Sequence, residues 1–124
     1  MADQFIKKKG NKFRVGVELF IFKEDNQFIA YSPALEISSY GDTSKDAGNA
    51  FQEAASIFVK YAHKKGTLIA DLLELGWTVT KKPKAVFSAP DLEDTVKSNP
   101  ILQSLISSGQ YQQSQTNMAV SAVS

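Results

Sequence analysis

The sequence has 124 residues and 43% of them are hydrophobic, so it can form one modest domain with its own core. The formal net charge is +1, from 14 basic and 13 acidic side chains, which excludes an overall field strong enough to indicate nucleic acid or a membrane as the partner. The sequence contains no Cys, and it shows neither a signal peptide nor an apolar run of the ~20 residues that span a bilayer. We therefore expect a soluble cytoplasmic protein that has no disulfides and does not contact a membrane.

The first eleven residues contain a run of three lysines, which predicts a solvated, partly frayed N-terminus. Five basic side chains occur within eight positions, and they are Lys7, Lys8, Lys9, Lys12 and Arg14. A phosphate-binding arm is the alternative interpretation of this cluster.

A β-hairpin is predicted next. Alternating apolar residues over 13–22, with further apolar residues at Phe20 and Phe22, predict a strand whose far end is covered on both faces. The polar turn at 23–26 leads directly into a second apolar run at 27–31, so these two strands should be antiparallel.

The second strand should stop at Pro33, because proline cannot donate a hydrogen bond to a strand ladder. A third strand is predicted over residues 35–40, where Glu36 and Tyr40 alternate with aliphatic residues. Both side chains should therefore face away from the apolar side of this strand.

A long amphipathic helix follows the third strand. Its predicted apolar face recurs at three- and four-residue spacing and consists of Ala47, Ala50, Phe51, Ala54, Ile57, Phe58, Tyr61 and Ala62. Asp42 or Thr43 is the predicted N-cap, with Asp46 placed to complete a capping box, and Gly66 is the predicted end.

A second, shorter helix is predicted between Thr67 as its cap and Gly76 as its end. Two short strands, at residues 77–80 and 85–87, then flank a basic turn. This turn contains Lys81, Lys82, Pro83 and Lys84.

Two weaker helices are predicted, one that starts after Asp91 and one that starts at Pro100. The fold class is therefore α+β, with a three-stranded antiparallel sheet and later strands packed on one long helix, followed by short helices. We divide the chain into an α/β domain at 1–90, a helical extension at 91–106 and a tail at 107–124. The tail is rich in Ser and Gln and is predicted to be disordered.

The segment FIAYSPALE at residues 28–36, the GDT tripeptide at 41–43 and the Asp46-Ala47 pair resemble the HicB family of bacterial antitoxins. The resemblance covers about residues 15–65. It implies a partial RNase H-like fold with the element order β-β-β-α-β. It also implies a protein without enzymatic activity that binds and neutralises a HicA-like toxin, a small ribonuclease that cleaves mRNA.

Many members of this family continue into a C-terminal DNA-binding domain. In this sequence, residues 92–106 predict only two short helices before the polar tail. DNA binding and repression of the protein's own operon are therefore left open.

The candidate partner-binding site lies around the ends of the second and third strands, where loops on a rigid scaffold usually present binding groups. Its residues are Tyr31, Ser32, Pro33, Glu36, Tyr40 and Asp42. This aromatic and acidic set would complement a basic toxin, although an ordinary solvated loop would have the same composition.

Two other functions are considered. A nucleic-acid-binding protein would use the N-terminal basic cluster together with Lys81, Lys82 and Lys84. A nuclease of RNase H type would need several carboxylates that converge on two divalent metals, and the candidates are Glu18, Glu36, Asp42, Asp46 and Glu53.

These carboxylates are predicted to lie on a strand, at a helix cap or on the helix surface, and these positions explain them better than a metal site does. His63 is adequately explained by its place near the helix C-terminus, and Trp77 by packing in the core. We therefore expect no catalytic residue, no metal and no cofactor. We also expect a homo-oligomer, most simply a dimer, in which the apolar segment 77–87 pairs with a second copy.

Overall fold

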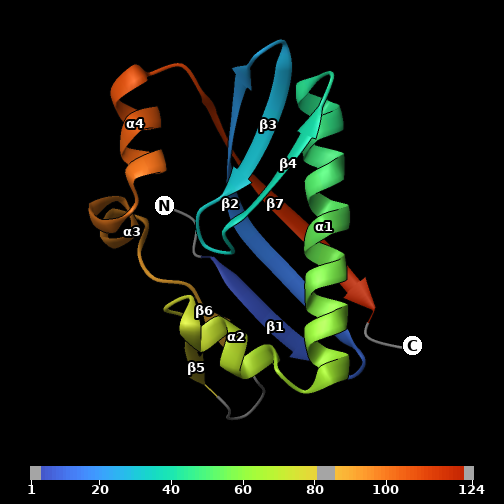
Figure 1. Ribbon diagram of the computed structural model, residues 1–124. Helices are drawn as coiled ribbons and strands as arrows, with labels where there is room; N and C mark the ends of the chain where they lie inside the picture. Colours follow the sequence, from blue (N-terminus) through green and yellow to red (C-terminus); the bar gives the residue numbers. More distant parts are fainter. Residues whose placement is uncertain (1–3, 81–85, 122–124) are drawn as a thin grey trace.

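Figure 1 shows a computed structural model of the chain, in which residues 4–80 and 86–121 are described. Its strands are β1 (Phe5–Lys9), β2 (Lys12–Glu24), β3 (Gln27–Ser32), β4 (Ile37–Gly41), β5 (Thr78–Thr80), β6 (Val86–Ser88) and β7 (Gln112–Ser121). Its helices are α1 (Ser44–Lys65), α2 (Leu68–Glu74), α3 (Leu92–Ser98) and α4 (Pro100–Ser108). The α+β class is confirmed, because the strands form one seven-stranded antiparallel sheet beside one long helix and three short ones.

Strand β2 is the centre of the sheet, since it pairs with three other strands. One end of it pairs with β1 and the other end with β3, while β7 pairs with β2 along Lys12 to Ile21. Because β7 overlaps both of the other pairings, β1 and β3 must share the opposite edge of β2. Between them the backbone N–H of Glu18 donates to Oε1 of Gln4 at 2.9 Å, so a side chain replaces the missing strand partner.

Two tight turns set the register of this central region. Asp25 and Asn26 connect β2 to β3 with φ of 51° and 66°, as a type I′ hairpin requires. Gly10 and Asn11 connect β1 to β2, which are paired from Phe5 to Lys9. Residues 5–9 of the segment predicted to be frayed therefore form a strand, because their backbone groups pair with those of both β2 and β6.

Helix α1 packs on one face of the sheet, and its buried residues are Ala47, Phe51, Ala55, Val59 and Ala62. The predicted apolar face was wrong in part, because Ile57 and Tyr61 are 60% and 61% exposed. Ala55 and Val59 complete a stripe with the same three- and four-residue spacing, rotated toward the sheet. Spacing alone does not distinguish these two stripes, so contact with the sheet decides between them.

The start of α1 depends on a close approach between β4 and the helix. Thr43 is the N-cap, and its Oγ1 accepts a hydrogen bond from the backbone N–H of Asp46 at 3.0 Å. A side chain on Gly41 would collide with the Ala47 backbone nitrogen and with Asp46. The glycine and threonine of the GDT tripeptide thus each have a structural role here, and Gly66 ends the helix with φ of 75° as predicted.

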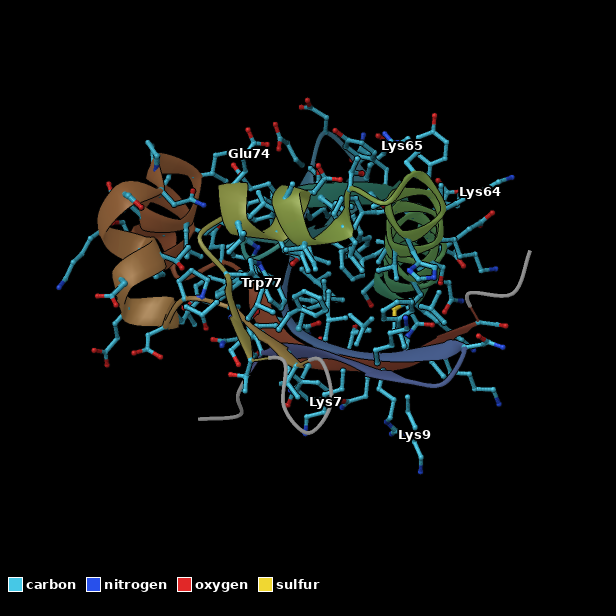
Figure 2. All side chains as sticks on the ribbon, turned by 90° about the horizontal axis from the view of Figure 1, so that it is seen from below. Lys7, Lys9, Lys64, Lys65, Glu74 and Trp77 are labelled. Carbon is cyan, nitrogen blue, oxygen red and sulfur yellow. The ribbon has the colours of Figure 1, made fainter. Side chains whose placement is uncertain are left out.

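Helix α2 lies on the same side of the sheet as α1 (Figure 2). Trp77 follows it and is 2% exposed, which confirms the prediction that this side chain belongs to the core. Its Nε1–H donates to the carbonyl oxygen of Ala34 at 2.9 Å, so the tryptophan ties the end of α2 to the turn between β3 and β4. This polar contact satisfies the indole nitrogen of a buried tryptophan.

The predicted disordered tail is also wrong over most of its length, because β7 pairs with β2 at ten successive positions. Few of its side chains are apolar, but Thr116 and Val120 are buried and Met118 packs against the core beneath α1. Backbone pairing with the central strand compensates for the polar composition that favoured disorder. Residues 112–121 are therefore part of the central sheet.

The segment expected to pair with a second copy is used within the chain. Strands β5 and β6 pair with each other, and β6 pairs with β1 through Phe87 opposite Ile6. The last strands thus extend the sheet beyond β1 and do not lie beside the β2–β4 meander. The basic turn of Lys81, Lys82 and Lys84 lies outside the described residues.

Helices α3 and α4 lie on the face of the sheet opposite α1. Registers place Phe20, Phe22, Ile29, Tyr31 and Tyr40 together on this second face. Leu102 of α4 is fully buried, and the Tyr111 ring lies 5.4 Å from the ring of Phe20. The sheet is therefore covered on both faces at its β3–β4 end.

Candidate partner-binding site

The structure divides the six residues of the predicted partner site into two groups. Tyr31, Ser32 and Pro33 are buried, whereas Glu36, Tyr40 and Asp42 are exposed. Ser32 Oγ accepts a hydrogen bond from the backbone N–H of Leu35 at 3.2 Å and so shapes the turn into β4. Ser32 thus shapes the turn that carries Glu36, whereas Asp42 follows the other end of β4, so the structure does not bring all six residues together.

Helix α4 is fixed to the sheet beside this site by Asn99, which lies just before it. Nδ2 of Asn99 donates to the Tyr31 hydroxyl at 2.8 Å, and Oδ1 of Asn99 accepts from the Leu102 backbone N–H at 3.0 Å. One side chain thus caps the helix and attaches it to β3. The Asn-Pro start of α4 is visible in the sequence, but its docking against β3 is not, and our sequence reasoning missed it.

Two open clefts flank the contact between α4 and the sheet. The first has a volume of about 630 Å³ and lies between the turn after β3 and the α3–α4 connection. Its lining includes Tyr31, Pro33, Glu36, Asp94, Asn99 and Ile101. The second has a volume of about 570 Å³ and lies between α4 and strands β2, β3 and β4.

The second cleft, which we call the α4 cleft, is lined mainly by apolar side chains. They are Phe22, Ile29, Tyr31, Tyr40, Pro100, Ile101 and Leu105, with Glu24, Ser38 and Ser104 as the polar members. Tyr40 and Ile101 are 58% and 56% exposed, so a tyrosine from β4 and an isoleucine from α4 both present apolar area to solvent at this cleft.

Each cleft has at least one acidic side chain in its lining. Glu24 lines the α4 cleft, while Glu36 and Asp94 line the first cleft. Asp94 lies 3.8 Å from the ammonium of Lys97, but both of these side chains are largely exposed, so the pair adds little stability. The apolar surface therefore has a rim with negative charge.

The carboxylates considered for nuclease chemistry lie on different parts of the fold. Glu18 is buried on β2, where its Oε2 accepts a hydrogen bond from Gln113 at 3.4 Å, and Glu36 lies in the turn before β4. Asp46 and Glu53 are exposed on α1. Within the described residues there is no group of three or more His, Asp or Glu side chains that could hold a metal ion.

The N-terminal basic cluster is divided between the two faces of the sheet. Lys7 pairs with Arg14 and Lys9 pairs with Lys12, and all four side chains are exposed. Lys8 lies opposite Phe13, on the face that carries α1.

Comparisons of this chain with protein-family models, with curated proteins and with solved structures found no match. None of the helices in the described residues is long and apolar enough to cross a membrane.

Proposed function

We propose that this chain is a protein-binding module without enzymatic activity, similar to a HicB antitoxin, and that it binds and neutralises a HicA-like mRNA-cleaving toxin. The proposed docking surface is the α4 cleft together with an acidic rim, which consists of Glu24 on that cleft and of Glu36 and Asp94 on the first cleft. The observation that carries the proposal is the pair of exposed apolar side chains, Tyr40 and Ile101, on either side of an open apolar cleft.

Burial of these side chains would favour association with a protein. Full burial of a large apolar side chain contributes about 1.5–3 kcal/mol, and aromatic anchors in clefts often dominate the energy of an interface. Tyr31 and Asn99 hold the two walls of the cleft together at 2.8 Å. The surface is therefore partly organised before a partner arrives, which reduces the entropy lost on binding.

The charge of the rim favours a basic partner. Glu24, Glu36 and Asp94 line the two clefts, and the only ion pair that the described residues contain involves Asp94. A ribonuclease that binds RNA must present positive charge, so the acidic rim would attract it and increase its association rate.

The resemblance to HicB supports the same proposal at the level of the fold. The β2–β3–β4 meander followed by α1 matches the β-β-β-α part of the partial RNase H-like order. The FIAYSPALE segment covers most of β3 and the turn before β4, and the GDT segment joins β4 to α1. The described C-terminal residues form α3, α4 and β7 and pack on this same domain.

The decisive experiment is co-expression of this protein with the HicA-like ribonucleases encoded in the genome that carries its gene. The expected result is restored growth, a complex that co-purifies, and a binding affinity that can be measured with a catalytically inactive toxin. Tyr40→Ala and Ile101→Ser should each lower that affinity by about tenfold or more.

A matched control is available on α1. Tyr61 is 61% exposed, close to the 58% of Tyr40, but it lies on a helix on the other face of the sheet. Tyr61→Ala should leave the affinity unchanged. The proposal fails if none of the toxins is neutralised, and the site assignment fails if Tyr61→Ala lowers the affinity as much as Tyr40→Ala does.

The charged rim can be tested in the same assay. Glu36→Lys should lower the association rate, and this difference should shrink as salt is added, because screening removes long-range attraction. Glu53→Lys makes the same charge change at an exposed position on α1 and should have little effect. Equal effects of the two substitutions would show that net charge, and not the rim, controls the rate.

We also propose that the protein is a homodimer. Strand β7 pairs only with β2 among the described residues, so one edge of a ten-residue strand is left open. Open edges are usually covered, and two-fold pairing is the commonest way to do this. Light scattering at tens of micromolar protein should give twice the mass of the chain, and a strictly monomeric mass would contradict the proposal.

A further inference from the structure

A basic surface lies on the sheet face opposite α1, at the end that α3 and α4 leave uncovered. The β1–β2 register places Lys7 directly opposite Arg14 and Lys9 directly opposite Lys12. Directly opposed residues of antiparallel strands point to the same face, with Cβ atoms about 4.5–5.5 Å apart. The four cations, which we call the basic face, therefore form two adjacent cross-strand pairs.

Figure 2 shows where this face points. Lys7 and Lys9 project from the sheet on the side away from α1 and α2, whereas Lys64 and Lys65 lie on the helix side. Lys7, Lys9, Lys12 and Arg14 are all exposed. The basic face is thus open to a large ligand.

The positive charge of this face is not neutralised within the described residues, whose single ion pair joins Asp94 to Lys97 on α3. Two acidic side chains of β2 point to the same side. Glu18 is buried, and Glu24 is ten residues from Arg14, or about 33 Å along a strand. Like charges that face each other across a strand pair destabilise a sheet. A bound polyanion would remove this repulsion.

An aromatic and an amide side chain adjoin the four cations. A side chain on Gly16 would come within 2.6 Å of Phe5 Cε1 and 3.0 Å of Asn117 Oδ1, so the Phe5 ring lies directly over the backbone of β2. The Lys7 ammonium lies 4.8 Å from the centre of that ring. Cations beside an aromatic group are the components that sequence-tolerant sites for single-stranded nucleic acid combine.

We propose that the basic face binds the phosphodiester backbone of single-stranded nucleic acid without sequence preference. Lys7, Lys9, Lys12 and Arg14 contact successive phosphates, while Phe5 and Asn117 contact the nucleotides that lie over β2. This function is separate from the proposed toxin binding, because the α4 cleft lies at the β3–β4 end of the sheet and shares none of these residues.

Fluorescence anisotropy with a labelled single-stranded RNA of mixed sequence tests the proposal on the full chain. The expected result is saturable binding at low salt, with an affinity that falls as salt increases. In a plot of log affinity against log salt, four phosphate contacts give a negative slope that is no steeper than about −3. A single-stranded DNA of the same sequence should bind similarly, and a duplex should bind more weakly.

The Lys7→Gln, Arg14→Gln double variant should bind at least tenfold more weakly, with a slope reduced by about 1.4 because two contacts are lost. Its thermal midpoint should not fall, because one like-charge pair is removed. The Lys64→Gln, Lys65→Gln double variant makes the same charge change on the opposite side of the molecule and should bind as the unmodified protein does.

Absence of salt-dependent RNA binding would overturn the proposal. Equal loss of binding in the two double variants would also overturn it, because net charge would then explain the effect. Tighter binding to the duplex would overturn the preference for single strands. These outcomes are independent of toxin neutralisation, which the Tyr40 and Ile101 variants test.

Discussion

Asn99 and Tyr31 form a 2.8 Å hydrogen bond that joins the start of α4 to strand β3 across 68 positions of sequence. The same asparagine caps α4 through the backbone N–H of Leu102. Helix α4 buries Leu102 but leaves Ile101 and Ile106 exposed, so few apolar contacts hold it to the sheet. This single polar contact therefore has a large part in the shape of the α4 cleft.

The first prediction concerns that contact. Asn99→Ser keeps a good capping residue but is too short to reach Tyr31, so it should lower the free energy of unfolding by about 1 kcal/mol. Asn99→Ala loses the cap as well and should cost about 1 kcal/mol more. Urea denaturation measures both values. The effects of Tyr31→Phe and Asn99→Ser should not add in the double variant, and full additivity would show that the two side chains are not coupled.

The second prediction concerns β7, which the sequence composition assigned to a disordered tail. Val120 is 1% exposed opposite Phe13, so Val120→Ala should lower the free energy of unfolding by about 2 kcal/mol. Ala119→Ser, at the exposed neighbouring position, should change it by less than about 0.5 kcal/mol. Chemical denaturation compares the two variants. Neutral behaviour of both would mean that the segment does not pair with β2 in solution.

The third prediction contrasts two glycines. Gly41→Ala places a methyl group against the Ala47 backbone nitrogen and should destabilise the protein by roughly 1–3 kcal/mol. Gly48 lies within α1 with no atom within 4 Å of an added Cβ. Gly48→Ala should therefore stabilise the protein, by up to about 1 kcal/mol, because alanine favours the helix. Thermal melts show whether each variant is more or less stable than the unmodified protein. Destabilisation by Gly48→Ala would contradict this account of the helix environment.

The fourth prediction separates two possible caps of α1. Thr43 accepts the capping hydrogen bond, so Thr43→Ala should lower the free energy of unfolding by about 1 kcal/mol. Asp42 lies one position earlier and is exposed, so Asp42→Ala should change the free energy of unfolding by about 0.5 kcal/mol or less. Guanidinium denaturation measures the difference. A larger loss for Asp42→Ala would mean that this carboxylate also supports the helix start.

Local chemistry made part of the fold predictable. The hairpin at Asp25 and Asn26, the Thr43 cap and the Gly66 end each depend on a few adjacent residues, and each was found in the sequence. The same kind of signal was present at Gly10 and Asn11, a two-residue turn between alternating strands, but the lysine content of the segment favoured a frayed N-terminus over the strand that forms.

The candidate site was less predictable than the helix caps and turns. Tyr40 and Glu36 are exposed, as their alternation with aliphatic residues predicted, but Glu36 lies in the turn before β4, because the strand predicted over 35–40 begins only at Ile37. Tyr31 was expected at the surface, but α4 covers it from a position 68 residues away. Ile101 lines the same cleft as Tyr31, but nothing in the sequence beyond its place in a short apolar helix indicated that it belongs to the site.

The sequence by itself determined the turn at Asp25 and Asn26, the two ends of α1 and the order of the central elements, because these depend on contacts between neighbouring residues. Only the tertiary structure decided which stripe of α1 is buried, that polar β7 is a strand, and that Lys7 and Lys9 face Arg14 and Lys12. Each of these outcomes requires a partner far away in sequence or on another element. Local propensity cannot specify such a partner, because its energy exists only once the sheet has formed.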